Sequence, residues 1–99
     1  MDKWLYVMQI NKEKTYNRLT KAIVTEHVEN IRRLDDEGHL ELCGVYKGYK
    51  GVAGMLILRA ESLEAADELC KREPLVVGGF ASYTLYAMQT ANRENNYLL

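Results

Sequence analysis

One histidine, His27, lies within residues 22–37, where the apolar spacing predicts an α-helix. The apolar residues recur at intervals of three and four and define the side expected to face the core: Ile23, Val24, Val28, Ile31 and Leu34. His27 falls between Ile23 and Ile31 on that same side. An imidazole can take up and release a proton near neutral pH. His27 is therefore either a general acid/base group or a histidine packed and satisfied in the core.

Three tyrosines on expected strands, Tyr46, Tyr83 and Tyr86, could line a pocket and hydrogen-bond a substrate oxygen. The alternative is that they are half-buried strand residues whose hydroxyls reach the rim of the core. His39 and Cys43 lack a second pair of ligands, so no metal site is expected. The glycines at 78 and 79 do not form a phosphate-binding motif, and no cofactor is expected.

The apolar pattern predicts four strands and two helices in a single domain over residues 1–90, followed by a tail at 91–99. The strands are expected over residues 4–10, 40–47, 52–60 and 80–90, and the second helix over 63–72. Thr20 and Ser62 are the expected N-caps, and Gly38 is the expected left-handed residue after the first helix. Pro74 is expected to end the second helix, with a compact apolar turn over residues 75–79.

This β-α-β-β-α-β order predicts an α+β, ferredoxin-like fold, an antiparallel four-stranded sheet with both helices on one face. The inward helix residues are expected to include Ile31, Leu34, Leu63 and Leu69. Apolar residues remain for the opposite face of the sheet, among them Leu5, Val7 and Leu85. Exposed apolar sheet surface is usually covered by a partner, so we expect a homodimer through this open face, with higher oligomers left open.

Composition excludes several classes of protein. The chain has 99 residues, 47% of them hydrophobic, and a net charge of −1, which is typical of a folded globular domain and not of a nucleic-acid binder. It has no run of eighteen apolar residues and no leader pattern, so we expect a cytoplasmic protein without membrane association. Cys43 and Cys70 are expected to be two buried free thiols.

With these elements in order, residues 4–90 resemble the YCII-like (YciI-related) family of the dimeric α+β barrel group. The resemblance rests on three stretches: EHVENIRRLDDEGHLELCG, which contains His27; AESLEAADELC, at the entry to the second helix; and Glu73-Pro74 followed by Gly78-Gly79. It implies a ferredoxin-like protomer that pairs as a dimeric α+β barrel. It also implies a pair formed by the helix histidine and an acidic residue, in a cleft under the sheet.

By this resemblance Glu73 is the acidic partner, at the position where the family has an aspartate before proline. The alternative for Glu73 is an exposed residue at the exit of a helix. The chain departs from the family pattern at Gly44-Val45, where glycine-proline is usual, and just before His27, where an arginine is common. Relatives in the barrel group include muconolactone isomerases and small oxygenases.

The sequence leaves three functions open. In the first, His27 and Glu73 perform general acid/base chemistry on a small cyclic or aromatic substrate, as an isomerase or lyase. In the second, the domain binds an unidentified small-molecule ligand without catalysis. In the third, it is an assembly module whose contacts are the open sheet face and the tail residues Tyr97-Leu98-Leu99.

Overall fold

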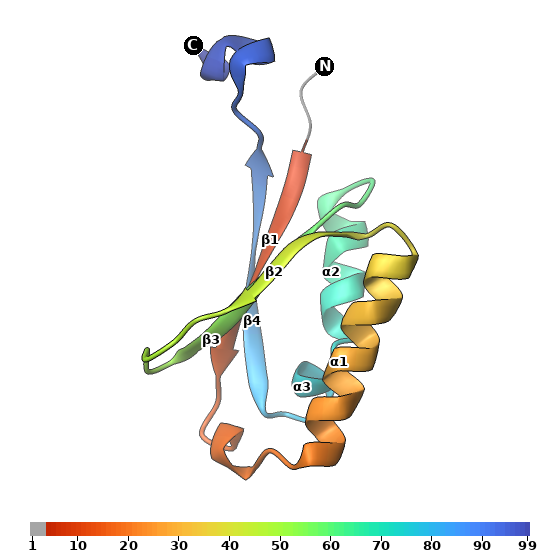
Figure 1. The fold of residues 1–99 in the computed structure, drawn as a ribbon, viewed down its shortest axis with the longest axis vertical. Helices are drawn as coiled ribbons and strands as arrows, with labels where there is room; N and C mark the ends of the chain where they lie inside the picture. Colours follow the sequence, from red (N-terminus) through yellow and green to blue (C-terminus); the bar gives the residue numbers. More distant parts are fainter. Residues whose placement is uncertain (1–3) are drawn as a thin grey trace.

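The computed structural model describes residues 4–99 and shows one sheet covered on one side by helices (Figure 1). Its elements are β1 (Trp4–Lys12), a 3-10 turn η1 (Tyr16–Arg18), α1 (Lys21–Asp36), β2 (Leu40–Val45), β3 (Val52–Leu58), α2 (Leu63–Lys71), α3 (Pro74–Val77), β4 (Ala81–Gln89) and a second 3-10 segment η2 (Arg93–Leu98). The predicted ferredoxin-like α+β fold is confirmed, and the element ends shift by only a residue or two.

The four strands form one antiparallel sheet in the order β2-β3-β1-β4. The central strand β1 pairs with β3 on one side and with β4 on the other, so that Met8 lies opposite both Leu56 and Leu85. Alternate residues of each strand therefore face the helices, and the residues between them face away. The β2 and β4 strands are the two edges of the sheet.

Local sequence signals begin and end the helices. The Thr20 hydroxyl accepts a hydrogen bond from the Ile23 N–H at 3.3 Å, and the Ser62 hydroxyl accepts one from Ala65 at 3.0 Å. Gly38 follows α1 with φ +80°, the left-handed conformation that a glycine adopts without strain. The three predictions for these residues are confirmed.

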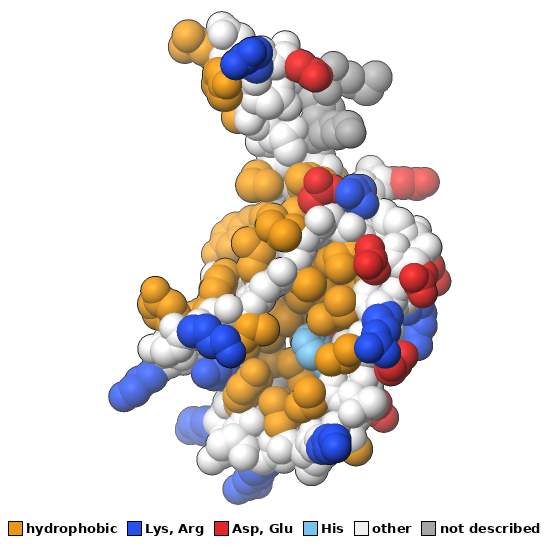
Figure 2. Space-filling model, viewed as in Figure 1, with side chains coloured by type: hydrophobic (Ala, Val, Ile, Leu, Met, Phe, Trp, Pro, Cys, Tyr) orange, Lys and Arg blue, Asp and Glu red, His pale blue; other side chains and the backbone are white. Residues whose placement is uncertain are grey.

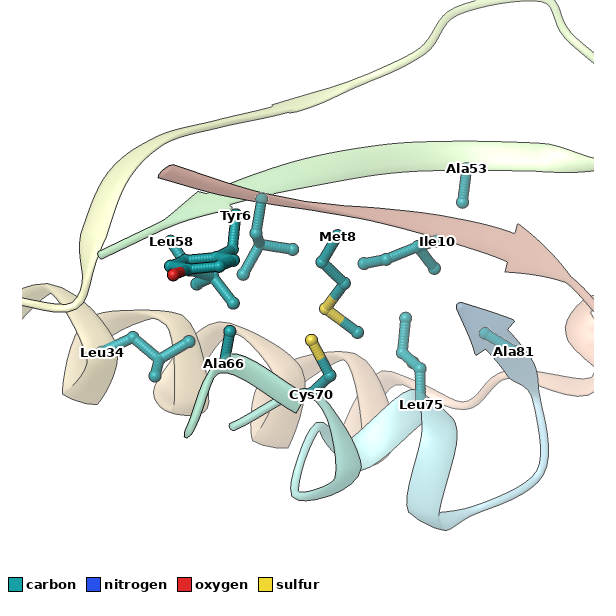
Figure 3. Close-up of a cluster of buried hydrophobic side chains, with 11 residues drawn as sticks. Tyr6, Met8, Ile10, Leu34, Ala53, Leu58, Ala66, Cys70, Leu75 and Ala81 are labelled. Atoms are coloured by element: carbon teal, nitrogen blue, oxygen red, sulfur yellow. The ribbon is translucent and has the colours of Figure 1, made fainter. Parts of the chain in front are cut away.

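The core lies between the sheet and the helices (Figure 3). The Met8 and Cys70 side chains point toward one another across it, from β1 and α2, and Leu75 of α3 completes this layer. The buried apolar residues are Tyr6, Met8, Ile10, Leu34, Ala53, Leu56, Leu58, Ala66, Cys70, Leu75 and Ala81. Burial of this apolar surface is the main force that holds the helices on the sheet.

The inward side of α1 is narrower than predicted. Val24 and Val28 are 43% and 39% exposed, whereas Asn30 is buried. A helix advances 100° per residue, so the line through Ile23 and His27 continues to Asn30 and leaves the two valines at its margin. The Asn30 side-chain nitrogen has no hydrogen-bond partner among the described residues.

Two other expected positions are wrong. Leu63 is 44% exposed, because Ala66 and Cys70 form the buried side of α2. Leu85 was expected on the open face but lies opposite Met8, and packs against the core on the helix side. The register of β4 against β1 decides this, and a shift of one residue would have moved the side chain to the other face.

Pro74 begins a helix as well as ending one. The segment expected to be only a turn contains α3, in which Pro74 occupies the first turn and Glu73 is the N-cap. Proline is favoured at the first position of a helix, because that residue needs no N–H for the helical hydrogen bonds. Residues 91–99 also have defined structure, since Asn92 and Asn95 cap each other at the start of η2.

Both cysteines are free, but only one of them is buried as predicted. Cys43 is exposed on the edge strand β2, whereas Cys70 lies in the core. Burial raises the pKa of the Cys70 thiol to about 12, with smaller contributions from the Asp67 and Glu73 carboxylates. The Cys70 thiol is therefore a packing group.

The open face of the sheet carries a band of apolar side chains, as predicted for Leu5 and Val7. Their cross-strand partners Ile57, Tyr86 and Met88 extend this band, as do Leu42, which pairs with Ile57, and Met55, which pairs with Gln9. Leu42 and Tyr86 are 59% and 55% exposed. Sheet surface of this kind is usually covered by another molecule.

We predict that Gly54→Ala destabilises the protein by about 1–3 kcal/mol, as measured by urea unfolding. A Cβ at Gly54 would overlap the Gly44 carbonyl oxygen and lie 3.2 Å from the Val45 Cα, so β2 and β3 would have to separate. The matched control is Gly44→Ala, whose added Cβ meets nothing within 4 Å. Equal stability of the two variants would contradict the close approach of these strands.

Candidate active site

His27 and Glu73 are in direct contact. The His27 Nδ1 atom, from the middle of α1, pairs with Oε1 of Glu73, which lies between α2 and α3. The side chains are 20% and 1% exposed, respectively. The alternative that Glu73 is an exposed residue at a helix exit is therefore wrong.

The other carboxylate oxygen of Glu73 fixes the side chain in place. Oε2 accepts a hydrogen bond from the Leu75 N–H at 2.8 Å, which is the N-cap bond of α3. The backbone of Glu73 is extended, with φ −64° and ψ 126°, as is normal for a residue before proline. One buried carboxylate thus caps α3 with one oxygen and orients the imidazole with the other.

His27 lines a cavity of about 110 Å³ between α1 and the β2-β3 side of the sheet. In Figure 2 a histidine is visible in a hollow surrounded by hydrophobic side chains, between the positions at which Figure 1 draws α1 and β2. The lining residues are Ile10, Tyr16, His27, Ile31, Cys43, Gly44, Val45, Ala53, Gly54, Met55, Leu56 and Leu75. A dry cavity of roughly 150 Å³ can hold benzene, so this hollow suits a group of about one small ring.

Four lining residues with polar or special backbone character were not predicted as site residues. Tyr16 belongs to η1, Cys43 and Gly44 belong to β2, and Gly54 belongs to β3. The sequence offered a signal only for the two glycines, because a glycine within a strand indicates a close backbone approach, and the structure brings Gly54 against the Gly44 carbonyl group. The wall opposite His27 is formed in part by these two glycines.

The three tyrosines expected to bind substrate are not among the residues that line this cavity. Tyr46 packs edge-on against Tyr49, with the ring centroids 6.3 Å apart, and Tyr86 lies on the open face opposite Val7. Tyr83 faces the helices, but at α2, where its hydroxyl donates to Asp67 Oδ1 at 2.5 Å. Strand register, which the sequence does not specify closely, separates all three from His27.

The Tyr83–Asp67 contact joins β4 to α2. The hydrogen bond to the carboxylate, with smaller contributions from burial and nearby acids, raises the pKa of Tyr83 to about 12. The same bond from Tyr83, together with Lys71, lowers the pKa of Asp67. This pair is a structural hydrogen bond between β4 and α2.

No group of three or more histidine, cysteine or acidic side chains within residues 4–99 is arranged to hold a metal ion. Over the same residues, no helix has the length and apolar character needed to cross a membrane.

A four-stranded antiparallel sheet with helices on one face, and a histidine–carboxylate pair beneath it, defines a ferredoxin-like α+β domain with one candidate acid/base site. The chain belongs to the YCII-related domain family, whose model matches residues 4–89. A comparison with curated proteins gives no match.

A solved structure with a similar fold is 5-chloro-2-hydroxyhydroquinone dehydrochlorinase from Burkholderia phenoliruptrix AC1100, in complex with 2,5-dihydroxybenzoquinone. The TM-score is 0.73, the sequence identity is 13%, and the match covers 93% of this chain and 99% of that one. At this identity the similarity establishes the shared fold.

We predict that Glu73→Ala lowers the free energy of unfolding by about 1–3 kcal/mol, because it leaves the Leu75 N–H and the imidazole of His27 without their buried partner. Glu73→Gln should lose less, since its amide oxygen can still cap α3. Urea unfolding of the two variants measures the difference. If Ala and Gln were equally stable, the cap would contribute nothing.

Proposed function

We propose that this protein is a small-molecule enzyme in which His27 acts as a general acid/base and Glu73 orients and stabilises its imidazole. The observation that carries the proposal is a buried carboxylate on Nδ1 of a histidine that lines an apolar cavity. A carboxylate on one ring nitrogen fixes the tautomer, and leaves the other nitrogen for proton transfer.

Each ring nitrogen has its own role in this proposal. With Glu73 ionised, Nδ1 carries the proton and donates a hydrogen bond to Oε1. Nε2 is then the basic nitrogen available to a bound substrate. When Nε2 takes a proton, the ring becomes positively charged beside the Glu73 carboxylate, which stabilises that charge. The apolar walls from Ile10, Ile31 and Leu75 strengthen this interaction by excluding water.

The size of the cavity supports a small cyclic or aromatic substrate. A lyase-type reaction of the kind named for the similar dehydrochlorinase would proceed by simple steps. For a chlorinated hydroxyhydroquinone in its keto tautomer, in which chlorine is on a saturated ring carbon, His27 Nε2 removes the proton of an enolic hydroxyl group. The O–H electron pair forms a carbonyl double bond, the ring double bond shifts to the chlorine-bearing carbon, and chloride leaves with its bonding pair. In an isomerisation, the same nitrogen removes a proton from one ring carbon and returns it to another. Both reactions need one group that can act as base and acid, which an imidazole provides.

The replacement of aspartate by Glu73 fits this role. Glutamate is one methylene longer, and its second oxygen is bound to the Leu75 N–H at the start of α3. The longer glutamate side chain is therefore held in position by its hydrogen bond with the Leu75 backbone.

We also infer that two copies associate through the open sheet face, as a dimeric α+β barrel. The apolar band centred on Val7, which lies between Ile57 and Tyr86, supports this arrangement. A two-fold dimer would cover the same surface on both copies.

This pairing predicts a dimer by light scattering coupled to size exclusion. Val7→Lys should shift it to monomer, because a charge would be buried at the interface. Val77→Lys, which alters an exposed residue of α3 on the helix side, should remain dimeric. A monomeric wild-type protein at high concentration would refute the pairing.

His27→Ala should lower turnover by about 10²–10⁴-fold while the fold remains intact, which is the usual contribution of general acid/base catalysis. The substrates to test are chlorinated hydroxyhydroquinones, by chloride release, and cyclic ketones, by exchange of ring protons with deuterated solvent. His39→Ala is the matched control, because His39 is outside the cavity and contacts the Arg59 carbonyl oxygen.

A cavity that only binds ligands gives a different result. His27→Ala would then weaken binding, and the wild-type protein would show neither chloride release nor proton exchange. Equal rates for His27→Ala and the wild-type protein would also contradict the assigned role.

A further inference from the structure

The charged residues of this chain are unevenly distributed along it. Two segments, residues 12–21 and 46–51, contain six lysines or arginines and one acid: Lys12, Lys14, Arg18, Lys21, Lys47 and Lys50, with Glu13. The rest of the chain contains the other seven basic residues and thirteen acids. Figure 2 shows blue side chains along the lower part and left side of the molecule, and most of the red ones above and to the right.

The cavity borders both basic segments. Ile10, just before the first basic segment, and Tyr16, within it, both line the cavity, and Val45 and Ala53 line it on either side of the second segment. The link between the two segments is direct. The Lys12 Nζ atom lies 5.3 Å from the centre of the Tyr16 ring and donates to the Tyr49 carbonyl oxygen at 3.3 Å.

The lining of the cavity does not offset the positive charge of the two basic segments. Its walls are mainly apolar, and the one carboxylate beneath it, Glu73, is buried and paired with His27. The first basic segment ends at Lys21, the N-terminus of α1, and the first turn of this helix has no acidic residue. An apolar cleft at a positively charged surface attracts anions and raises their local concentration.

We propose that the His27 cavity takes an anionic, ring-sized ligand, such as a phenolate or aromatic carboxylate, which the basic segments 12–21 and 46–51 attract. This inference rests on the proposed site and names the class of its ligand. A neutral ring of equal size has the same apolar contacts but no attraction to the lysines. The surface lysines attract the anion as it approaches the cavity, and the apolar walls of the cavity contact its ring.

Benzoate and benzamide are the probes, because they share a ring and differ in charge. Both are titrated into the full chain, with binding followed by shifts of the backbone amides that line the cavity. Benzoate should bind more tightly than benzamide at low salt, and lose this advantage at high salt, where the charges are screened.

Lys47→Gln/Lys50→Gln is the test variant, since both side chains are exposed on the β2-β3 turn. Each charge at about 10 Å in water contributes roughly a factor of two, so benzoate should bind about fourfold more weakly and benzamide should be unaffected. Arg33→Gln/Arg93→Gln removes the same charge outside the basic segments and should change benzoate binding little.

Equal affinity for the two probes, binding of neither, or an equal effect of both double variants would overturn the inference. So would a single-stranded oligonucleotide that bound more tightly than benzoate, because the basic segments would then serve a polyanion. These titrations do not depend on turnover. A protein that prefers benzoate but catalyses nothing refutes only the enzymatic role, whereas a catalyst indifferent to ligand charge refutes only this inference.

Discussion

A carboxylate that is almost entirely removed from water must have hydrogen-bond donors, because an unpaired buried charge costs several kcal/mol. Glu73 meets this constraint with two contacts, the imidazole of His27 and the N–H of Leu75. Together they tie α1 to the start of α3, which are distant in sequence. The position of α3 and the orientation of the imidazole follow from these contacts, whereas the extended backbone of Glu73 follows from Pro74.

The sheet supplies the other half of the site. The close approach of Gly44 and Gly54 brings β2 against β3, and both glycines line the cavity opposite His27. A side chain at Gly54 would push the strands apart, whereas a Cβ at Gly44 would meet nothing within 4 Å. Apart from Met55, the apolar side chains on the far face of the same sheet do not line the cavity, and the second copy that we propose would cover them.

The element order, the caps of α1 and α2 and the inward direction of His27 could be predicted from the sequence, since each depends on local spacing. His27 follows Ile23 and precedes Ile31 and Leu34 along one line of the helix, which no tertiary contact needs to define. The burial of Glu73 could not be predicted in this way. A glutamate before proline indicates only an extended backbone, and the resemblance to the family supplied its partner.

Side-chain facing on the strands was less predictable, because it depends on register. Leu85 and Tyr83 both face the helices, whereas Tyr86 faces away, and one residue of slip would have reversed all three. Tyr16 was missed as a lining residue because it lies in a polar connection, where a single aromatic residue gives no periodic signal.

The central claim concerns one proton, on Nδ1 of His27 and shared with Glu73. Nitrogen NMR of the imidazole at mildly alkaline pH measures its position directly, with His39→Ala used to assign the signals. Our account predicts a protonated Nδ1 and an unprotonated Nε2 for His27, and a change in this pattern in Glu73→Gln. A proton on Nε2, or signals indistinguishable from those of a free histidine, would contradict it.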